Sequence, residues 1–148
     1  MNINNTIRST RTTFWIQAAM TIAAITLFET GILPKNCINL TPTMQYISEV
    51  AGIILTITLI PLAIKGFSAH MRRAAEQEMP HFNEYFRSRC NARLSIIFAV
   101  TITNILLYYG TANNGALYCA LFGIAATIYS YPTKETLSNY TLNKEEKK

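Results

Sequence analysis

Four long apolar stretches divide the chain, and polar residues gather between them. The stretches cover about residues 14–33, 46–64, 94–111 and 115–131 of the 148-residue sequence. Apolar side chains occupy nearly every face of each stretch, without the long polar stripe that a surface helix of a soluble domain carries. Pro34 ends the first stretch and Pro132 ends the fourth, because proline cannot continue a helix. The pattern therefore predicts four helices and an all-α fold.

The lengths of these stretches fit a membrane better than a protein core. A helix needs about 20 residues to cross a hydrocarbon layer about 30 Å thick, and the fourth stretch lies at the short end of the usual range. Half of the residues are apolar and only 14% are charged, against about 25% in a typical soluble domain. A chain of this size cannot build a soluble core that hides four such helices. We therefore expect an all-α integral membrane protein, a four-transmembrane-helix bundle in one domain.

The basic residues give this bundle an orientation. Lys35 alone lies between the first two stretches, whereas the other 12 of the 13 Lys and Arg residues lie at the opposite ends of the helices. Because Lys and Arg are enriched in cytoplasmic loops, both termini and the middle loop are predicted to be cytoplasmic, including the tail 132–148. The net charge of +5 then reflects topology. The predicted partner is the lipid bilayer, and no nucleic acid is expected.

The segment between the second and third stretches, about residues 65–93, is predicted to form a helical hairpin arm. Met79-Pro80 divides it, because the residue before a proline avoids the helical conformation and proline cannot continue a helix. Apolar residues recur at three- or four-residue steps on both sides of that break, which is typical of amphipathic helices. Each half is expected to extend one membrane helix into the cytoplasm.

Three uses of this arm fit the pattern. Its two halves pack on each other as a solvated hairpin, or it lies as a basic amphipathic surface on anionic lipid. The third use is a docking surface for a partner protein, formed by Phe82, Tyr85 and Phe86. The sequence does not separate the lipid from the partner protein.

Glu29 and Glu49 are the two acidic residues within the predicted spans. An ionisable residue inside a membrane is costly, so each raises a functional hypothesis. Both lie near the outer ends of their helices at similar depth, because the first two spans run in opposite directions. One hypothesis is a shared ion or proton site, or pairing with Lys35, while Asn104 in the third span lines a polar path. The alternative is that both carboxylates reach the headgroups and Asn104 hydrogen-bonds across helices.

Small residues mark one face of the fourth stretch. They recur at every fourth position, as Gly115, Cys119, Gly123 and Thr127. This spacing lets helix backbones approach closely, and the partner is another helix of this chain or of a second copy. The turn before it, Ala112-Asn113-Asn114, is followed by Gly115, and Asn and Gly tolerate the left-handed backbone that a tight turn needs. The last two helices are therefore expected to be antiparallel neighbours.

No catalytic motif accompanies this architecture. The sequence lacks GxSxG, HExxH, Walker and GxGxxG patterns, and its cysteines and histidines have no metal-ligand spacing. No catalytic residue, cofactor or metal is therefore expected. The leading hypothesis is a non-catalytic subunit, scaffold or regulator of a membrane complex, and the alternative is a small transporter or channel that uses the two carboxylates. The composition, which is rich in Asn, Thr and Ile and has no recognisable organelle signal, favours a bacterial inner membrane.

Overall fold

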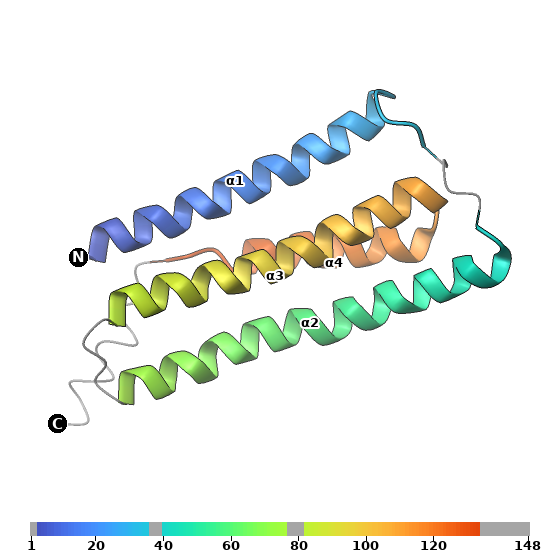
Figure 1. Ribbon diagram of the computed structural model, residues 1–148. Helices are drawn as coiled ribbons and strands as arrows, with labels where there is room; N and C mark the ends of the chain where they lie inside the picture. The colour runs from blue at the N-terminus through green and yellow to red at the C-terminus, as the bar shows by residue number, and fades with distance from the viewer. Residues whose placement is uncertain (1–2, 36–39, 77–81, 134–148) are drawn as a thin grey trace.

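The computed structural model describes residues 3–35, 40–76 and 82–133, and they form four α-helices. These are α1 (Ile3–Glu29), α2 (Pro42–Glu76), α3 (Phe82–Thr111) and α4 (Asn114–Tyr129). Successive helices run in opposite directions along a common axis (Figure 1). The prediction of an all-α protein with four helices is confirmed. The predicted hairpin break at Met79-Pro80 lies outside the described residues.

The bundle has two ends that differ in composition. The arm end comprises residues 3–13, 65–76 and 82–93, and the turn end comprises residues 30–35 and 40–42 and the turn between α3 and α4 (Figure 1). α3 is the central helix, because it packs against each of the other three, whereas α1 packs mainly against α3. α4 also contacts α2. The interior of the bundle is thus organised around α3.

Two of the helices are long and apolar enough to cross a membrane by length and composition. They are α2, over Pro42–Ala74, and α3, over Glu84–Thr111. α4 is apolar but has only 16 residues. α1 has 27 residues, but Gln17 and several threonines interrupt its apolar stretch.

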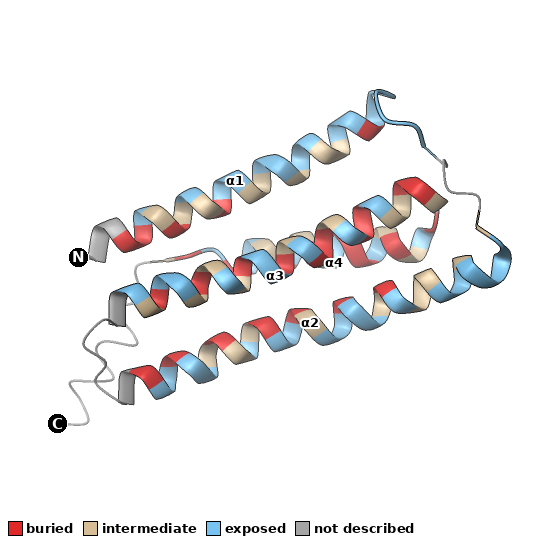
Figure 2. Cartoon of the chain, viewed as in Figure 1, coloured by how far each residue is buried: buried red, intermediate tan, exposed pale blue. Residues whose placement is uncertain are grey.

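Buried residues face the inside of the bundle (Figure 2), and large apolar side chains are exposed on much of its outside. The buried side chains form three clusters along the axis. One lies at the arm end, around Met71 and Phe86. A second lies midway, around Ile60 and Ile97, and the third lies near the turn end, around Tyr109. The packing is therefore continuous from one end of the bundle to the other.

The arm end contains a third helix, which the apolar pattern of the sequence did not predict. α1 begins at Ile3, well before the apolar stretch that starts at Phe14. Thr6, Ile7 and Thr10 are buried, and Ile7 joins the arm cluster formed by side chains of α2 and α3. The arm is therefore a three-helix unit rather than a hairpin alone.

Two residues with a left-handed backbone end the helices at the turn end. Gly31 follows α1 with φ 77°, a conformation that glycine adopts without steric cost. Between α3 and α4, the left-handed residue is Ala112, with φ 54°. Asn113, which we expected to take part in the left-handed turn, has an extended backbone with φ −87°, and its side chain accepts a hydrogen bond from the Gly115 N–H. Asn113 is therefore the N-cap of α4.

Candidate functional site

The candidate ion-site residues lie on different pairs of helices, and each has its own neighbours. Glu29, the last residue of α1, forms an ion pair of 2.8 Å with Lys35, and its other oxygen accepts a 2.6 Å hydrogen bond from the Tyr109 hydroxyl. The Tyr109 ring stacks on Phe28 with 4.5 Å between ring centroids. The contacts of Glu29 therefore tie the segment after α1 to α3.

Glu49 lies instead at the contact between α2 and α4. A Cβ atom built on Gly115 would overlap the Glu49 Oε1 atom, and it would lie only 2.9 and 3.0 Å from the Glu49 Cδ and Cγ atoms. The carboxylate is thus packed on the first turn of α4, where the N-terminal end of the helix dipole favours negative charge. Gly115, the first of the four small residues, is what allows this approach. Glu49 therefore has a packing role against the N-terminal end of α4.

Two arginines act at the other end of α4. The Arg93 Nη2 atom donates a 2.9 Å hydrogen bond to the carbonyl of Ser130, the C-cap residue, and the Arg11 Nε atom donates one of 3.3 Å to the carbonyl of Pro132. The Arg93 guanidinium also lies 4.2 Å from the centre of the Phe67 ring. The last carbonyls of a helix lack partners within the helix and carry partial negative charge. Neighbouring helices therefore place a carboxylate at the N-terminal end of α4 and two guanidinium groups at its C-terminal end.

Asn104 sits in the contact between α2 and α3, with 1% of its surface exposed. Its Nδ2 atom donates hydrogen bonds of 2.9 Å to Thr56 Oγ1 on α2 and to the Val100 carbonyl on its own helix. Its Oδ1 atom is buried without a hydrogen-bond partner among the described residues, and it lies against Gly52. Asn104 is therefore a cross-helix hydrogen-bonding group with one unused acceptor.

The other small residues of α4 face α3 and α2. A Cβ atom on Gly123 meets Thr101 Oγ1 and also the Thr101 Cβ and Cα atoms, at 3.1 and 3.3 Å. Contact with a backbone atom means that α3 and α4 themselves approach closely here. Cys119 is buried, whereas Thr127 is partly exposed and donates to the Gly123 carbonyl. Gly115 and Gly123 thus serve packing within this chain.

The residues of the predicted partner surface on the arm do not form one exposed surface. Phe86 is 1% exposed and lies in the arm cluster, with its ring centroid 5.8 Å from that of Phe67. Tyr85 is partly exposed, with the Arg89 guanidinium 5.0 Å from its ring centre. The side chain of Phe82 lies outside the described residues. Phe86 is therefore part of the interior of the arm and not of its surface, because its apolar ring completes the contact between α2 and α3.

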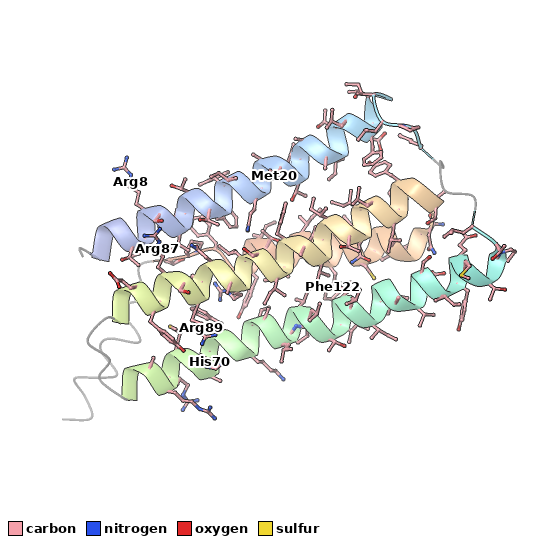
Figure 3. The ribbon with its side chains drawn as sticks, in the orientation of Figure 1. Arg8, Met20, His70, Arg87, Arg89 and Phe122 are labelled. Carbon is pink, nitrogen blue, oxygen red and sulfur yellow. The ribbon has the colours of Figure 1, made fainter. Side chains whose placement is uncertain are left out.

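The exposed surface of the arm is mainly basic. Arg8 points away from the bundle (Figure 3), and the side chains of Arg72 and Arg73 on α2 are exposed as well. Cys90 lies beneath this surface, 1% exposed, and burial raises the pKa of its thiol to about 11. The arm therefore combines an apolar interior with a cationic exterior.

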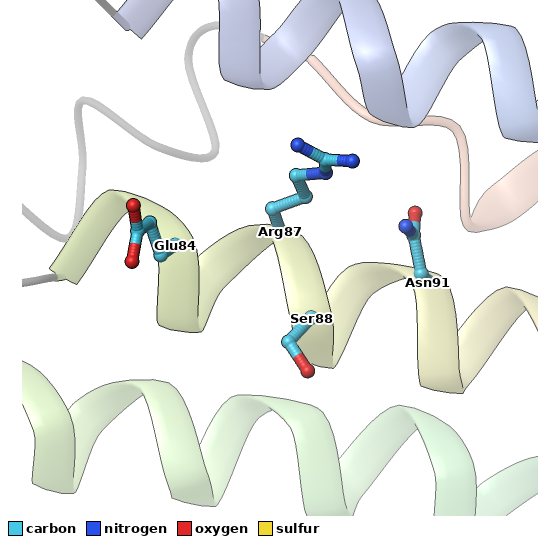
Figure 4. Close-up of a pocket in the computed structure, with 4 residues that line it drawn as sticks. All are labelled: Glu84, Arg87, Ser88 and Asn91. Carbon is cyan, nitrogen blue, oxygen red and sulfur yellow. The ribbon is translucent and has the colours of Figure 1, made fainter. Parts of the chain in front are cut away.

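Two hollows in the described part of the chain border these elements. A polar hollow of about 260 Å³ is lined by Glu84, Arg87, Ser88 and Asn91 of α3. Figure 4 shows Arg87 and Asn91 on the side of α3 that faces α1. An apolar groove of about 440 Å³ runs between α2 and α4, with Pro61 and Phe122 in its lining. Neither hollow contains Glu29, Glu49 or Asn104 in its lining.

No group of three His, Cys, Asp or Glu side chains that could hold a metal ion occurs among the residues that the structure describes. The described cysteines, Cys90 and Cys119, are free and buried.

Several contacts in the structure connect residues that the sequence pattern did not link. The sequence pattern assigned no role to Tyr109, and it used Arg11 and Arg93 only among the basic residues that predict the topology. A signal was present, because Glu29 and Tyr109 both lie close to the C-terminal ends of their helices, which run in the same direction and end at the same side of the bundle. The helical N-terminal segment had no such signal, since its buried positions are mostly threonines.

No protein-family model, no curated protein and no solved structure matches this chain.

Proposed function

We propose that the chain is a four-span membrane protein whose arm and termini lie in the cytoplasm of a bacterial cell. The two long apolar helices, α2 and α3, supply the first support. α1 and α4 pack on α3, and α4, with 16 residues, lies beside the part of α3 toward the turn end (Figure 1). A membrane that surrounds this part of α3 therefore also surrounds α4 and the neighbouring part of α1. Large apolar side chains are exposed on the outside of the bundle, among them Ile57 and Phe122 at 68% and 71%. Lipid is the solvent that removes them from water.

The charges of the described residues support the orientation. Lys35 is the one basic residue at the turn end, and the others lie at the arm end: Arg8, Arg11, Lys65, Arg72, Arg73, Arg87, Arg89 and Arg93. The excess of Lys and Arg on one side of a membrane marks the cytoplasmic side.

Within the membrane we propose a non-catalytic role, as a subunit, scaffold or regulator that contacts an acidic partner protein through the arm. The observation that carries this proposal is the use of the polar residues inside the bundle. Glu29 pairs with Lys35, Glu49 packs on α4, and Asn104 bonds to Thr56. These groups stabilise the helix contacts, which leaves the basic surface of the arm as the prominent feature without a role inside the fold.

The test is recovery of the tagged full-length chain from its native membranes in mild detergent, with the stoichiometry of co-purifying proteins measured. We expect one protein at a fixed ratio, lost in the variant Arg72→Glu/Arg73→Glu. The matched control is Glu29→Gln, which changes a charge at the turn end and is expected to keep the partner. Recovery of the chain alone, or only with itself, contradicts the proposal.

A transporter or channel is the second candidate, because the Asn104 Oδ1 atom is a buried acceptor that the described residues leave unused. A transport role predicts that Glu29→Gln or Glu49→Gln abolishes solute or proton flux in reconstituted vesicles while the chain stays folded. Unchanged flux in both variants rejects it.

A further inference from the structure

Charged residues, together with the Tyr109 hydroxyl on α3, mark the two ends of an apolar layer, and helix geometry gives the thickness of that layer. On α3, Arg93 and Tyr109 are 16 residues apart, which is about 24 Å at a rise of about 1.5 Å per residue. On α2, Lys65 and Glu49 are also 16 residues apart, again about 24 Å. The two longest apolar helices therefore give the same spacing.

The other two helices agree with this value. On α1, Arg11 and Glu29 are 18 residues apart, or about 27 Å. On α4, Glu49 lies against Gly115 and Arg93 bonds to Ser130. These two positions are 15 residues apart, or about 22 Å. The separations on α1, α2 and α3 are thus closely similar, and the value for α4, which depends on the same Glu49 and Arg93, agrees with them.

The contacts of the charged side chains keep these boundaries where they are. A free Lys or Arg near the end of a membrane helix reaches along the axis toward the headgroups, which lengthens the apolar span. Here Arg93 turns sideways to the Ser130 carbonyl and the Phe67 ring. Glu29 is likewise held by Lys35 and Tyr109. These two side chains are engaged across the bundle, so they add little to its height, whereas Lys65, the arm-end boundary on α2, is exposed.

We infer that the bundle fits a hydrocarbon layer of about 22–27 Å, several ångströms thinner than the typical value of about 30 Å. Its lipid partners are therefore phospholipids with short acyl chains. Tilt of the helices lowers the matching thickness of the hydrocarbon layer further, because it reduces the height of the helices along the membrane normal. This inference rests on the proposed membrane insertion and adds a lipid specificity to it.

A thicker layer has a definite physical cost for this chain. It draws the ends of α4 into hydrocarbon, together with the Arg93–Ser130 contact and the Glu49 carboxylate. Backbone and charged groups there have no water to bond. The bilayer must then thin around the protein, or the bundle must loosen.

The experiment reconstitutes the full chain into vesicles of dimyristoleoyl, dioleoyl or dierucoyl phosphatidylcholine, a series of increasing thickness. Resistance to carbonate extraction reports insertion, and circular dichroism gives the midpoint of thermal unfolding. We expect the midpoint to be highest in the thinnest vesicles and to fall by several degrees in the thickest. The variant Glu29→Leu/Lys35→Leu, which extends the apolar surface at the turn end without changing the net charge, is expected to weaken this dependence. Arg72→Leu, on the exposed arm, is expected to leave it unchanged.

The outcomes are distinguishable. A chain that inserts fully but is equally or more stable in the thickest vesicles overturns the inference and leaves the membrane proposal intact. A chain that carbonate removes from all three vesicles overturns both.

Discussion

Replacing Gly123 by Ala tests the close contact between α3 and α4, and Gly66 in α2 provides a matched control. Both glycines lie inside helices, where alanine is favoured by up to about 1 kcal/mol. A Cβ atom on Gly66 meets nothing within 4 Å, whereas one on Gly123 meets Thr101 Oγ1 and approaches the Thr101 Cα atom to 3.3 Å. The same substitution is therefore expected to have opposite effects at the two positions.

The size of the difference follows from the contact. Inserting a methyl group into a packed interface costs about 1–3 kcal/mol, because neighbouring atoms must move. The gain in helix propensity is common to both variants, so the difference between Gly66→Ala and Gly123→Ala isolates a steric cost of about 1–3 kcal/mol. We expect Gly66→Ala to raise the free energy of unfolding and Gly123→Ala to lower it.

The measurement is reversible unfolding in mild detergent, followed by circular dichroism during a titration with a denaturing detergent. A second variant, Thr101→Ala/Gly123→Ala, removes the Oγ1 atom that the new methyl group meets. It is expected to recover part of the lost stability, because the backbone contact remains. If Gly123→Ala stabilises the chain as much as Gly66→Ala does, the close approach of α3 and α4 is refuted.

Three further predictions concern other contacts. In a double-mutant cycle, Asn104→Ala and Thr56→Ala are expected to show a coupling energy of about 0.6–2 kcal/mol in detergent unfolding, and additive effects contradict the cross-helix hydrogen bond. Ala112→Gly is expected to stabilise the chain by about 1 kcal/mol and Gly31→Ala to destabilise it by a similar amount, because both backbones are left-handed; the reverse order rules out these turn conformations. Cys90, with its pKa raised to about 11, is expected to react with maleimide at pH 7 far more slowly in the folded than in the unfolded chain. If mass spectrometry shows equal rates in the two states, Cys90 is accessible to solvent and the packed interior of the arm is ruled out.

The N-terminal segment shows where prediction from sequence reaches its limit. A stretch with Thr6, Ile7 and Thr10 has no apolar periodicity, so nothing in the sequence alone marked it as part of a buried contact. The arm cluster decides the matter, because Phe67 and Phe86 leave a position that Ile7 fills. For the same reason, a prediction from the arm alone placed Phe86 on a partner surface, although a third helix and its own hairpin partner cover it.

The candidate polar residues illustrate the same division. The sequence indicated that the two carboxylates lie near helix ends, where their cost is low, and that they could pair with Lys35. Which partner each one takes depends on which helices are neighbours. α1 lies on α3, so Glu29 meets Tyr109, and α2 lies beside α4, so Glu49 meets Gly115 instead of Glu29.

The sequence by itself determined the helical class, the number of helices and the concentration of basic residues at one end. These depend on local composition and on the spacing of apolar residues, which act within one helix. The tertiary structure alone decided the three-helix arm, the partners of the two carboxylates and the charges at both ends of α4. Those contacts join residues up to 121 positions apart, as Arg11 and Pro132 are. They depend on the order in which the helices pack around α3, and no pattern within a single helix specifies that order.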